Sequence, residues 1–318
     1  MASHPLLYFH LLAFVVHSTN TIIFANIGIT SGEVKPDIVN YVSTGISKEG
    51  IEMSETVIFS GVSITSIVMV NELITAVSHG GAFLGFFCYQ RVMLMDDKHT
   101  EVVRRYLEYS ITAGFLEAAL YLSTKNNFNE LLAIIVTNVV LQIIGYMSER
   151  TDLIMRKVYH FLSGIILLII PISYIITGAA SLDENSAMLV AVMYTILYLL
   201  FGIHNILGIN EEYSKYIDKD VGFTILSIVT KTVLSWMVVV WQRKHFKMND
   251  IEVTPDISSH IDFDNFLMWM PLGSIFAAIV LFVYASTLDT SCGEYEKGIM
   301  CKSDGPAVGI FPLPVKSV

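Results

Sequence analysis

Residues 221–242 read VGFTILSIVTKTVLSWMVVVWQ, and this stretch decides the fold. A helix needs about 20 apolar residues to cross the roughly 30 Å hydrocarbon core of a bilayer, so the stretch predicts a transmembrane helix. Its only charged residue, Lys231, lies about ten residues from either end, about 15 Å along a helix, which is too far for its side chain to reach the interface. Because a charged lysine at this depth costs about 2.5 kcal/mol or more, Lys231 must face the bundle interior, pair with an acid or be covalently modified.

The polar residues of this stretch fall on one side of the predicted helix. Thr224, Ser227, Lys231 and Ser235 are spaced at i−7, i−4, i and i+4, which places them on one stripe. We expect this polar stripe to point inward. Burial disfavours the ammonium form and leaves a nucleophilic amine, which is suited to Schiff-base formation. The alternative is a buried salt bridge without chemistry.

The composition of the whole chain agrees with a membrane protein. Of 318 residues, 53% are hydrophobic and 15% charged, and the mean hydropathy is +0.60. A soluble domain has about 25% charged residues, so the soluble classes are excluded. The formal net charge of −10 argues against a nucleic-acid partner. The three cysteines form neither a disulfide framework nor a metal-binding spacing.

Seven further runs are apolar enough to cross a bilayer. They are residues 6–27, 66–90, 102–123, 131–147, 158–177, 187–207 and 266–286. The first run lacks a basic flank and contains histidines, so it is not a signal peptide. We predict an all-α membrane protein with a seven-helix bundle over residues 1–245 and a carboxyl-terminal extension over 246–318.

The eighth run, residues 266–286, leaves two topologies open. A full eighth crossing returns the tail to the cytoplasm, where Cys292 and Cys301 stay reduced. An outer tail allows these two cysteines to form a disulfide.

The connection between the first two runs, residues 28–65, is the longest within the bundle. Its second half, residues 57–64, reads VIFSGVSI and is rich in β-branched and aromatic side chains. We expect a small extracellular β segment or hairpin on the membrane surface. The alternative is a longer, tilted second helix.

The distribution of Lys and Arg in short loops predicts the orientation. With the amino terminus inside, nine cations fall on the inner side: Arg91, Lys98, Arg104, Arg105, Arg150, Arg156, Lys157, Lys215 and Lys219. Six fall on the outer side: Lys35, Lys48, Lys125, Arg243, Lys244 and Lys247. This bias favours a cytoplasmic amino terminus, although the last three outer cations oppose it.

The third run supplies a partner for the lysine. Residues 104–114 read RRYLEYSITAG and contain Glu108. If Lys231 carries a carbonyl ligand such as retinal, a protonated Schiff base needs a nearby carboxylate, and Glu108 is the candidate. Thr112 and Phe115 continue the same helix face at i+4 and i+7. Glu117 lies nine positions on, on nearly the opposite face, and is a poor second counterion.

Two motifs together resemble the heliorhodopsins, a family of retinal-binding seven-helix photoreceptors. They are LSIVTKTVLSW at residues 226–236 and RRYLEYSITAG at residues 104–114, and the resemblance covers about the first 245 residues. It implies covalent all-trans-retinal on Lys231, Glu108 as counterion, an inner amino terminus and a homodimer. It also implies internal histidines at His17 and His79, and Glu149 at the end of the fourth run.

The same resemblance guides the expected wall of a retinal pocket. Ser227 stands one turn before Lys231, where rhodopsin pumps usually have an aspartate, so a single carboxylate stabilises the Schiff base. The expected contacts are Ser227, Tyr109, Thr112, Trp236, Phe201 and Asn138, with Tyr198 or Phe115 as further wall residues.

Several titratable residues inside the runs make passive light-gated proton conduction a hypothesis alongside a slow light sensor. The relay candidates are His17, His79, Glu72 and Glu117, with His204 in the sixth run. Glu72 and His79 are seven residues apart and share a helix face. A directional pump is disfavoured, because no acid near Lys231 follows the pump pairing.

Each relay candidate also has a purely structural interpretation. His17 and His79 form a polar cluster that holds the dark state, and Glu72 is an acid near the outer interface. Glu117 is a hydrogen-bonded or protonated carboxyl packed against the second or fourth helix. His204 caps the inner end of the sixth helix beside Asn205.

Two other classes stay open. The first is a small-molecule transporter in which Lys231 and Glu108 form an ion pair and no chromophore is bound; the chain has no broken half-helices that would favour it. The second is an intramembrane enzyme, but the chain contains neither HExxH nor GxSxG, so we expect no enzyme.

Overall fold

The computed structural model describes residues 5–30, 35–47, 50–89, 97–151, 153–182, 185–208 and 218–248. In these ranges there are seven helices and one β-hairpin. In chain order they are α1 (Pro5–Thr30), β1 (Ile38–Ser47), β2 (Gly50–Phe59), α2 (Ile64–Tyr89), α3 (Asp97–Leu122), α4 (Phe128–Arg150), α5 (Ile154–Ser181), α6 (Asn185–Leu207) and α8 (Lys219–Met248). Residues 266–286 and the two tail cysteines lie outside the described ranges.

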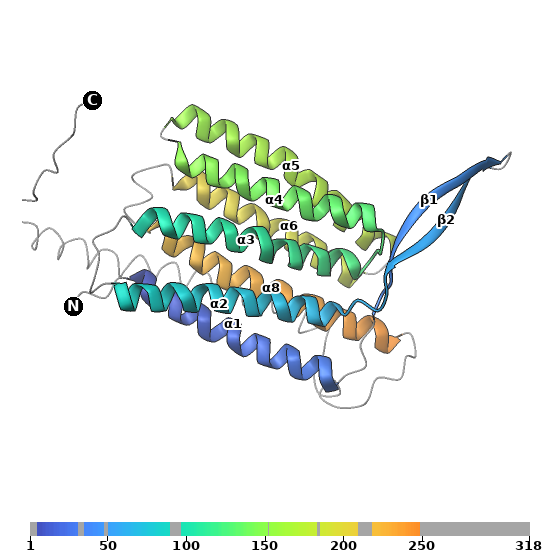
Figure 1. Ribbon diagram of the computed structural model, residues 1–318, viewed down its shortest axis with the longest axis horizontal. Coiled ribbons are helices and arrows are strands. Elements are labelled where there is room, and N and C mark those ends of the chain that lie inside the picture. The colour runs from blue at the N-terminus through green and yellow to red at the C-terminus, as the bar shows by residue number, and fades with distance from the viewer. Residues whose placement is uncertain are drawn as a thin grey trace, which may run out of the picture.

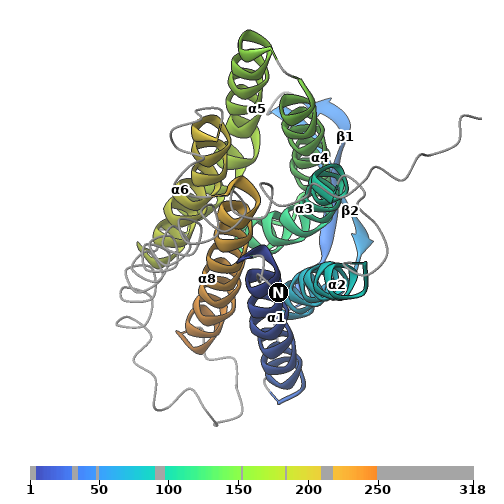
Figure 2. The same cartoon turned by 90° about the vertical axis from the view of Figure 1, so that its left-hand side faces the viewer.

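The helices run alternately up and down and form one bundle (Figure 1). Each packs against its neighbour in the chain, and α8 closes the bundle by contacting α6, α1, α3 and α2. Figure 2 shows α8 lying between α1 and α6. From Val221 to Gln242, side chains on all faces of α8 are buried or nearly so, which explains why this part of the helix is apolar all round apart from its stripe of polar residues.

Six of the described helices are long and apolar enough to cross a membrane: α1, α2, α4, α5, α6 and α8. The helix that does not meet this measure is α3, although it is as long as α1 and α2. It carries Glu101, Arg104, Arg105, Glu108 and Glu117, all within the bundle. These charged side chains have partners within the bundle and lower the mean hydropathy of α3 below that of the other six helices.

Two arginines and the end of α8 correct the cation count on which the orientation was predicted. Arg104 and Arg105 lie within α3 rather than in a loop, and their charges are paired with buried acids. The helix α8 continues to Met248, so residues 243–247 extend the helix instead of following it. The apolar run ends at residue 242, but the backbone hydrogen bonds of the helix continue past it, so hydropathy alone placed the end of the helix too early.

The connection after α1 contains an antiparallel hairpin that projects beyond the end of the bundle (Figure 1). Its register pairs Ile38 with Phe59 and Ile46 with Ile51. Gly61 then adopts a positive φ of 64°, and α2 begins at Ile64. Residues 57–59 are therefore strand, and a longer second helix is not what the chain forms. The sequence indicated only the second strand, because polar residues interrupt the apolar run of the first, IVNYVSTGIS.

Candidate functional site

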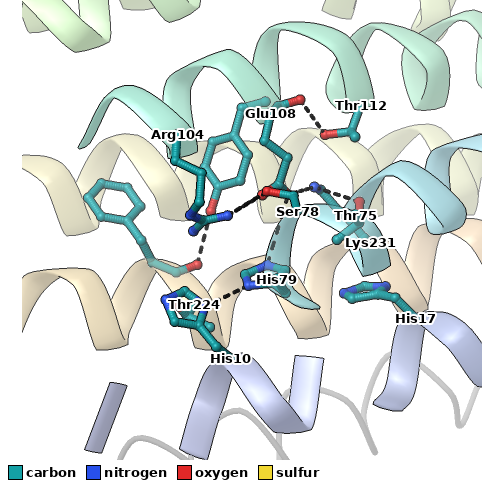
Figure 3. Close-up of polar contacts among 12 residues, drawn as sticks. His10, His17, Thr75, Ser78, His79, Arg104, Glu108, Thr112, Thr224 and Lys231 are labelled. Atoms are coloured by element: carbon teal, nitrogen blue, oxygen red, sulfur yellow. Dashed lines mark hydrogen bonds and ion pairs between the residues drawn. The ribbon is translucent and has the colours of Figure 1, made fainter. Parts of the chain in front are cut away.

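Lys231 forms a buried ion pair where α8, α3 and α2 meet (Figure 3). Its Nζ donates to Glu108 Oε1 at 2.5 Å and to Thr75 Oγ1 at 3.0 Å. The exposed fractions of the two charged side chains are only 6% and 2%. The structure thus brings together the lysine and the glutamate that the sequence singled out, and adds a hydroxyl from α2.

The second carboxylate oxygen of Glu108 is also held. Glu108 Oε2 accepts from Ser78 Oγ at 2.6 Å and from Arg104 Nη1 at 2.7 Å. Arg104 donates in turn to Glu101 through Nε at 2.9 Å and Nη2 at 2.5 Å. Two cations and two carboxylates therefore alternate in this part of the bundle, which compensates charges that would be costly alone.

Aromatic side chains line one side of the ion pair. Tyr109 follows Glu108 in α3, and its ring centroid is 5.0 Å from Lys231 Nζ. The Tyr109 hydroxyl donates to the Phe223 carbonyl at 3.1 Å, and the Phe201 ring packs edge-on at 5.5 Å. These contacts fix the orientation of the Tyr109 ring beside the amine.

A cavity of about 150 Å³ extends from this point between α3, α4, α5, α6 and α8. Its lining is mostly apolar and includes Lys231, Tyr109, Phe201, Tyr198 and Glu117. Asn138 supports the wall from behind: its Oδ1 accepts from the Tyr198 hydroxyl at 2.7 Å, and its Nδ2 donates to the Ser110 carbonyl at 3.0 Å. The buried amine therefore opens onto an apolar space.

Several expected wall residues lie elsewhere. The Trp236 ring packs on Phe24 at 5.0 Å, and its Nε1 donates to Asn20 Oδ1 at 3.2 Å, so it faces α1 and not the cavity. Five residues of helix turn Trp236 about 140° away from Lys231. Thr112 donates to the Glu108 carbonyl at 2.9 Å. Thr112, Ser227 and Phe115 are not among the described residues that line the cavity.

Glu72 is completely buried within the described bundle. Its Oε2 lies 2.6 Å from His17 Nδ1 and accepts from Asn20 Nδ2 at 3.1 Å. Its Oε1 accepts from Ser235 Oγ at 2.6 Å. Glu72 therefore has buried polar partners on α1 and α8, and its depth in the membrane stays a prediction.

His79 does not contact Glu72 along α2, although the two share a face. Its Nδ1 lies 2.8 Å from His10 Nδ1 on α1, and its Nε2 lies 3.9 Å from Glu108 Oε1. The His17 ring stacks on it with 6.2 Å between centroids. His17 of α1 thus stands between Glu72 and His79, the two ends of the expected relay along α2.

Glu117 and His204 have partners that the sequence did not suggest. Glu117 Oε1 accepts from the Tyr194 hydroxyl on α6 at 2.7 Å, so its partner helix is neither α2 nor α4. His204 Nε2 donates to the Lys219 carbonyl at 2.9 Å, which ties α6 to the first turn of α8. A side chain at Gly222 would overlap the His204 ring, so this contact requires a glycine there.

Sequence reasoning missed a second charged cluster toward the start of α3. Arg105 donates to Glu149 Oε2 at 2.6 Å and to Asp220, and its guanidinium lies 4.2 Å from the Phe223 centroid. The Tyr106 hydroxyl donates to the other Glu149 oxygen at 2.8 Å. Arg105 thereby joins α3 to α4 and α8.

Sequence reasoning identified Glu108 but missed the residues that surround it. A local signal was present, because Glu101, Arg104 and Glu108 are spaced at i, i+3 and i+7, the spacing of ion pairs along one helix face. Thr75, Ser78 and Asn20 carried no such signal. Their roles depend on which helices pack together.

Comparison with known proteins gives three findings. The family model for heliorhodopsin matches residues 6–241. No curated protein matches the chain. Among solved structures, halorhodopsin, a light-driven chloride pump, is 12% identical, with a TM-score of 0.55 over 78% of this chain and 98% of that one.

Two further structures are similar. A ground-state structure of a halorhodopsin variant is 13% identical, with a TM-score of 0.54 over 79% of this chain and 100% of that one. A light-driven proton pump from Leptosphaeria maculans is 11% identical, with a TM-score of 0.51 over 78% and 97%. At such identities the likeness shows the fold alone.

Proposed function

Because this chain belongs to the heliorhodopsin family of retinal-binding, light-sensitive, multi-pass membrane proteins, we propose that Lys231 holds all-trans-retinal as a protonated Schiff base with Glu108 as its counterion. The 2.5 Å contact between Lys231 Nζ and Glu108 Oε1 carries this proposal. An amine buried against a carboxylate can keep a positive charge at this depth, which an isolated amine cannot.

The residues around the ion pair fit retinal. A polyene aldehyde needs an amine at its reactive end, a carboxylate beside the linkage and an apolar space for its chain. Lys231 lies on the cavity wall, and Tyr109, Phe201 and Tyr198 supply aromatic surface there. When bound, retinal supplies light absorption and photoisomerisation.

In the proposed mechanism the protein's own groups hold the positive charge and limit where its proton can go. Glu108 Oε1 faces Lys231 Nζ, while Arg104 and Ser78 hold Oε2. Thr75 Oγ1, 3.0 Å from Nζ, orients the amine toward the carboxylate. The apolar lining of the cavity keeps water from the rest of the site.

An absorption spectrum tests the proposal. We expect purified protein incubated with all-trans-retinal to develop a visible band that is absent in Lys231→Ala. Lys219→Ala is the matched control, because Lys219 is in the same helix but pairs with Glu149 at 3.4 Å and should leave the band intact. A band that persists in Lys231→Ala overturns the proposal. No band in the wild type favours a transporter with a bare ion pair.

We also propose a topology and an assembly that follow from family membership. Residues 1–245 form the retinal-binding bundle, with all seven helices crossing the membrane, the amino terminus in the cytoplasm and the hairpin outside. Because α8 ends at Met248, the boundary predicted at residue 245 moves to that residue, and the residues after it lie outside the described ranges. The protein is a homodimer in this proposal.

A second candidate function is light-gated passive proton conduction, and the buried chain of acids and histidines favours it. Glu72 and His17 are 2.6 Å apart, and the His17 ring stacks on His79, whose Nε2 lies 3.9 Å from Glu108. Histidine can exchange protons near neutral pH, which a relay requires.

Patch-clamp recording under illumination distinguishes conduction from sensing. With retinal supplied and a pH gradient imposed, a channel gives a photocurrent that reverses near the proton Nernst potential. Absence of photocurrent at all voltages favours a light sensor that does not conduct protons. If current flows, Glu72→Gln and Glu117→Gln should reduce it, and unchanged current in both variants would contradict the relay.

A further inference from the structure

A second set of contacts leads from Glu108 through His79 to His10 (Figure 3). His79 Nε2 lies 3.9 Å from Glu108 Oε1, and His79 Nδ1 lies 2.8 Å from His10 Nδ1. His10 Nε2 lies 3.6 Å from Glu101 Oε2. Each imidazole therefore presents one nitrogen to the group before it and the other to the group after it.

This alternation is the arrangement that carries a proton through histidine. A neutral imidazole has one N–H donor and one acceptor nitrogen, so it can accept a proton on one side and release another on the other. The four groups come from three helices: His10 from α1, His79 from α2, and Glu108 and Glu101 from α3. All four are buried, so bulk water does not bypass them.

The series runs toward one end of the bundle. Glu101 is in the first turns of α3 and His10 in the first turns of α1, both at the end opposite the hairpin (Figure 1). Arg104, which holds Glu101 through two hydrogen bonds, has a side chain that is 19% exposed. Glu101 is thus the buried acid nearest to solvent along this series.

We propose that His79, His10 and Glu101 form a proton-transfer branch that connects Glu108 to the membrane face where α3 begins. The branch rests on the proposed retinal function, and it specifies where a proton that reaches Glu108 goes next. Glu101 is the terminal proton acceptor of this branch. His10 is not among the relay candidates predicted from the sequence or from the family resemblance.

The transfer balances without any other reactant. His79 Nε2 accepts the proton from Glu108 Oε1, and the proton on His79 Nδ1 passes to His10 Nδ1. The proton on His10 Nε2 then passes to the Glu101 carboxylate. Only N–H and O–H bonds form and break, and both histidines are neutral before and after. The 3.9 and 3.6 Å gaps exceed a hydrogen bond, so small ring movements must close them.

The geometry favours this direction over the Glu72 side. Arg104 faces both Glu108 and Glu101, so the two carboxylates of the branch share one cation. The nitrogens of His79 are directed to His10 and Glu108 rather than to His17.

Two variants and a matched control test the branch. Glu101→Gln keeps an oxygen for Arg104 but cannot bind a proton as a carboxylate does, and His10→Gln breaks the series in the middle. Glu130→Gln is the control: this glutamate, 27% exposed at the start of α4, pairs with Tyr121 and Lys125 at the other end of the bundle.

Two readouts are used on the retinal-loaded full chain. Light-minus-dark infrared spectra record the C=O stretch of carboxyl groups that gain a proton. A pH-indicator dye records protons exchanged with solvent. We expect Glu101→Gln to lose one positive carboxyl band, and both variants to slow light-induced proton exchange at least about tenfold. The control should match the wild type.

The outcomes separate the branch from the function on which it rests. All three variants should retain the visible band, because none replaces Lys231 or Glu108. Unchanged carboxyl bands and exchange rates in both Glu101→Gln and His10→Gln, with a normal visible band, overturn the branch and leave the retinal function standing. Absence of the visible band in the wild type overturns both.

Discussion

The carboxylate of Glu108 accepts from Lys231 and Ser78 and pairs with Arg104, so its two oxygens serve different partners. Oε1 faces the amine, and Oε2 faces the arginine. Replacing a buried carboxylate that compensates two cations leaves an uncompensated charge, which is strongly unfavourable. Of the two cations, the Schiff base on Lys231 loses its proton more readily than Arg104, so it responds first to the loss of the carboxylate.

Glu108→Gln is therefore expected to make the Schiff base lose its proton at neutral pH and to shift absorption from the visible to shorter wavelengths. Acidification should restore a visible band, because the linkage can then be protonated from solvent. A pH titration of the absorption spectrum measures this. Glu108→Asp, which keeps the charge, should titrate closer to the wild type; equal titrations of Glu108→Gln and the wild type would contradict the counterion assignment.

At the scale of elements, α1 and α2 pack tightly beside the histidine pair, His10 and His79. A Cβ atom placed on Gly80 would lie 2.8 Å from the Phe14 ring of α1. Small residues let membrane helices pack at short distance. Because Gly80 directly follows His79, the closeness of the two backbones also sets the His10–His79 contact.

Gly80→Ala is expected to force α1 away from α2 and to destabilise the bundle by about 1–3 kcal/mol, the usual cost of overpacking. Thermal unfolding of the retinal-loaded protein measures the loss. Gly81→Ala is the matched control, because a Cβ there meets nothing within 4 Å. Similar stability of the two variants would show that the α1–α2 contact tolerates separation.

The Arg105 cluster gives a second prediction at this scale. Arg105→Ala leaves Glu149 and Asp220 without their shared cation, and we expect a loss of about 3 kcal/mol or more. The change in thermal midpoint checks it, with the exposed Arg156→Ala as control. A loss no larger than that of the control would mean that Lys219 alone compensates the two acids.

At the scale of the whole molecule, the hairpin and the starts of α1 and α3, toward which the proposed proton-transfer branch leads, lie at opposite ends of the bundle (Figure 1). The hairpin joins the end of α1 to the start of α2, and Val39 bonds to the Asn126 carbonyl at 2.9 Å. The starts of α1, α3 and α5 lie at the other end (Figure 1). Orientation in the membrane therefore decides on which side the branch meets solvent.

We predict that the hairpin is extracellular. In a chain whose native cysteines are replaced by alanine, Glu55→Cys on β2 should react with a membrane-impermeant maleimide in intact cells. Arg156→Cys near the start of α5 should react only after permeabilisation. Both residues are exposed, so accessibility reports the side of the membrane rather than burial. The reverse labelling pattern would invert the proposed topology.

Much of the fold could be predicted from the sequence because the hydrocarbon core acts on each segment separately. The seven runs of residues 6–242 coincide with the seven described helices, and Lys231 and Glu108 drew attention as charges that a bilayer penalises. Both predictions use only local composition and helical periodicity, which are properties of each segment and do not depend on the helices that pack against it.

Tertiary structure alone decided which polar groups meet. From the sequence, Arg104 and Arg105 were counted with the loop cations, but their partners lie on α2, α4 and α8. Trp236 was expected to line the pocket, but it packs against α1. His10 becomes a neighbour of Glu101 only because α1 packs where α2 and α3 meet. Ion pairing and proton transfer depend on distances of a few ångströms between side chains on different helices. Those distances are set by how the helices pack and cannot be derived from the sequence of one helix.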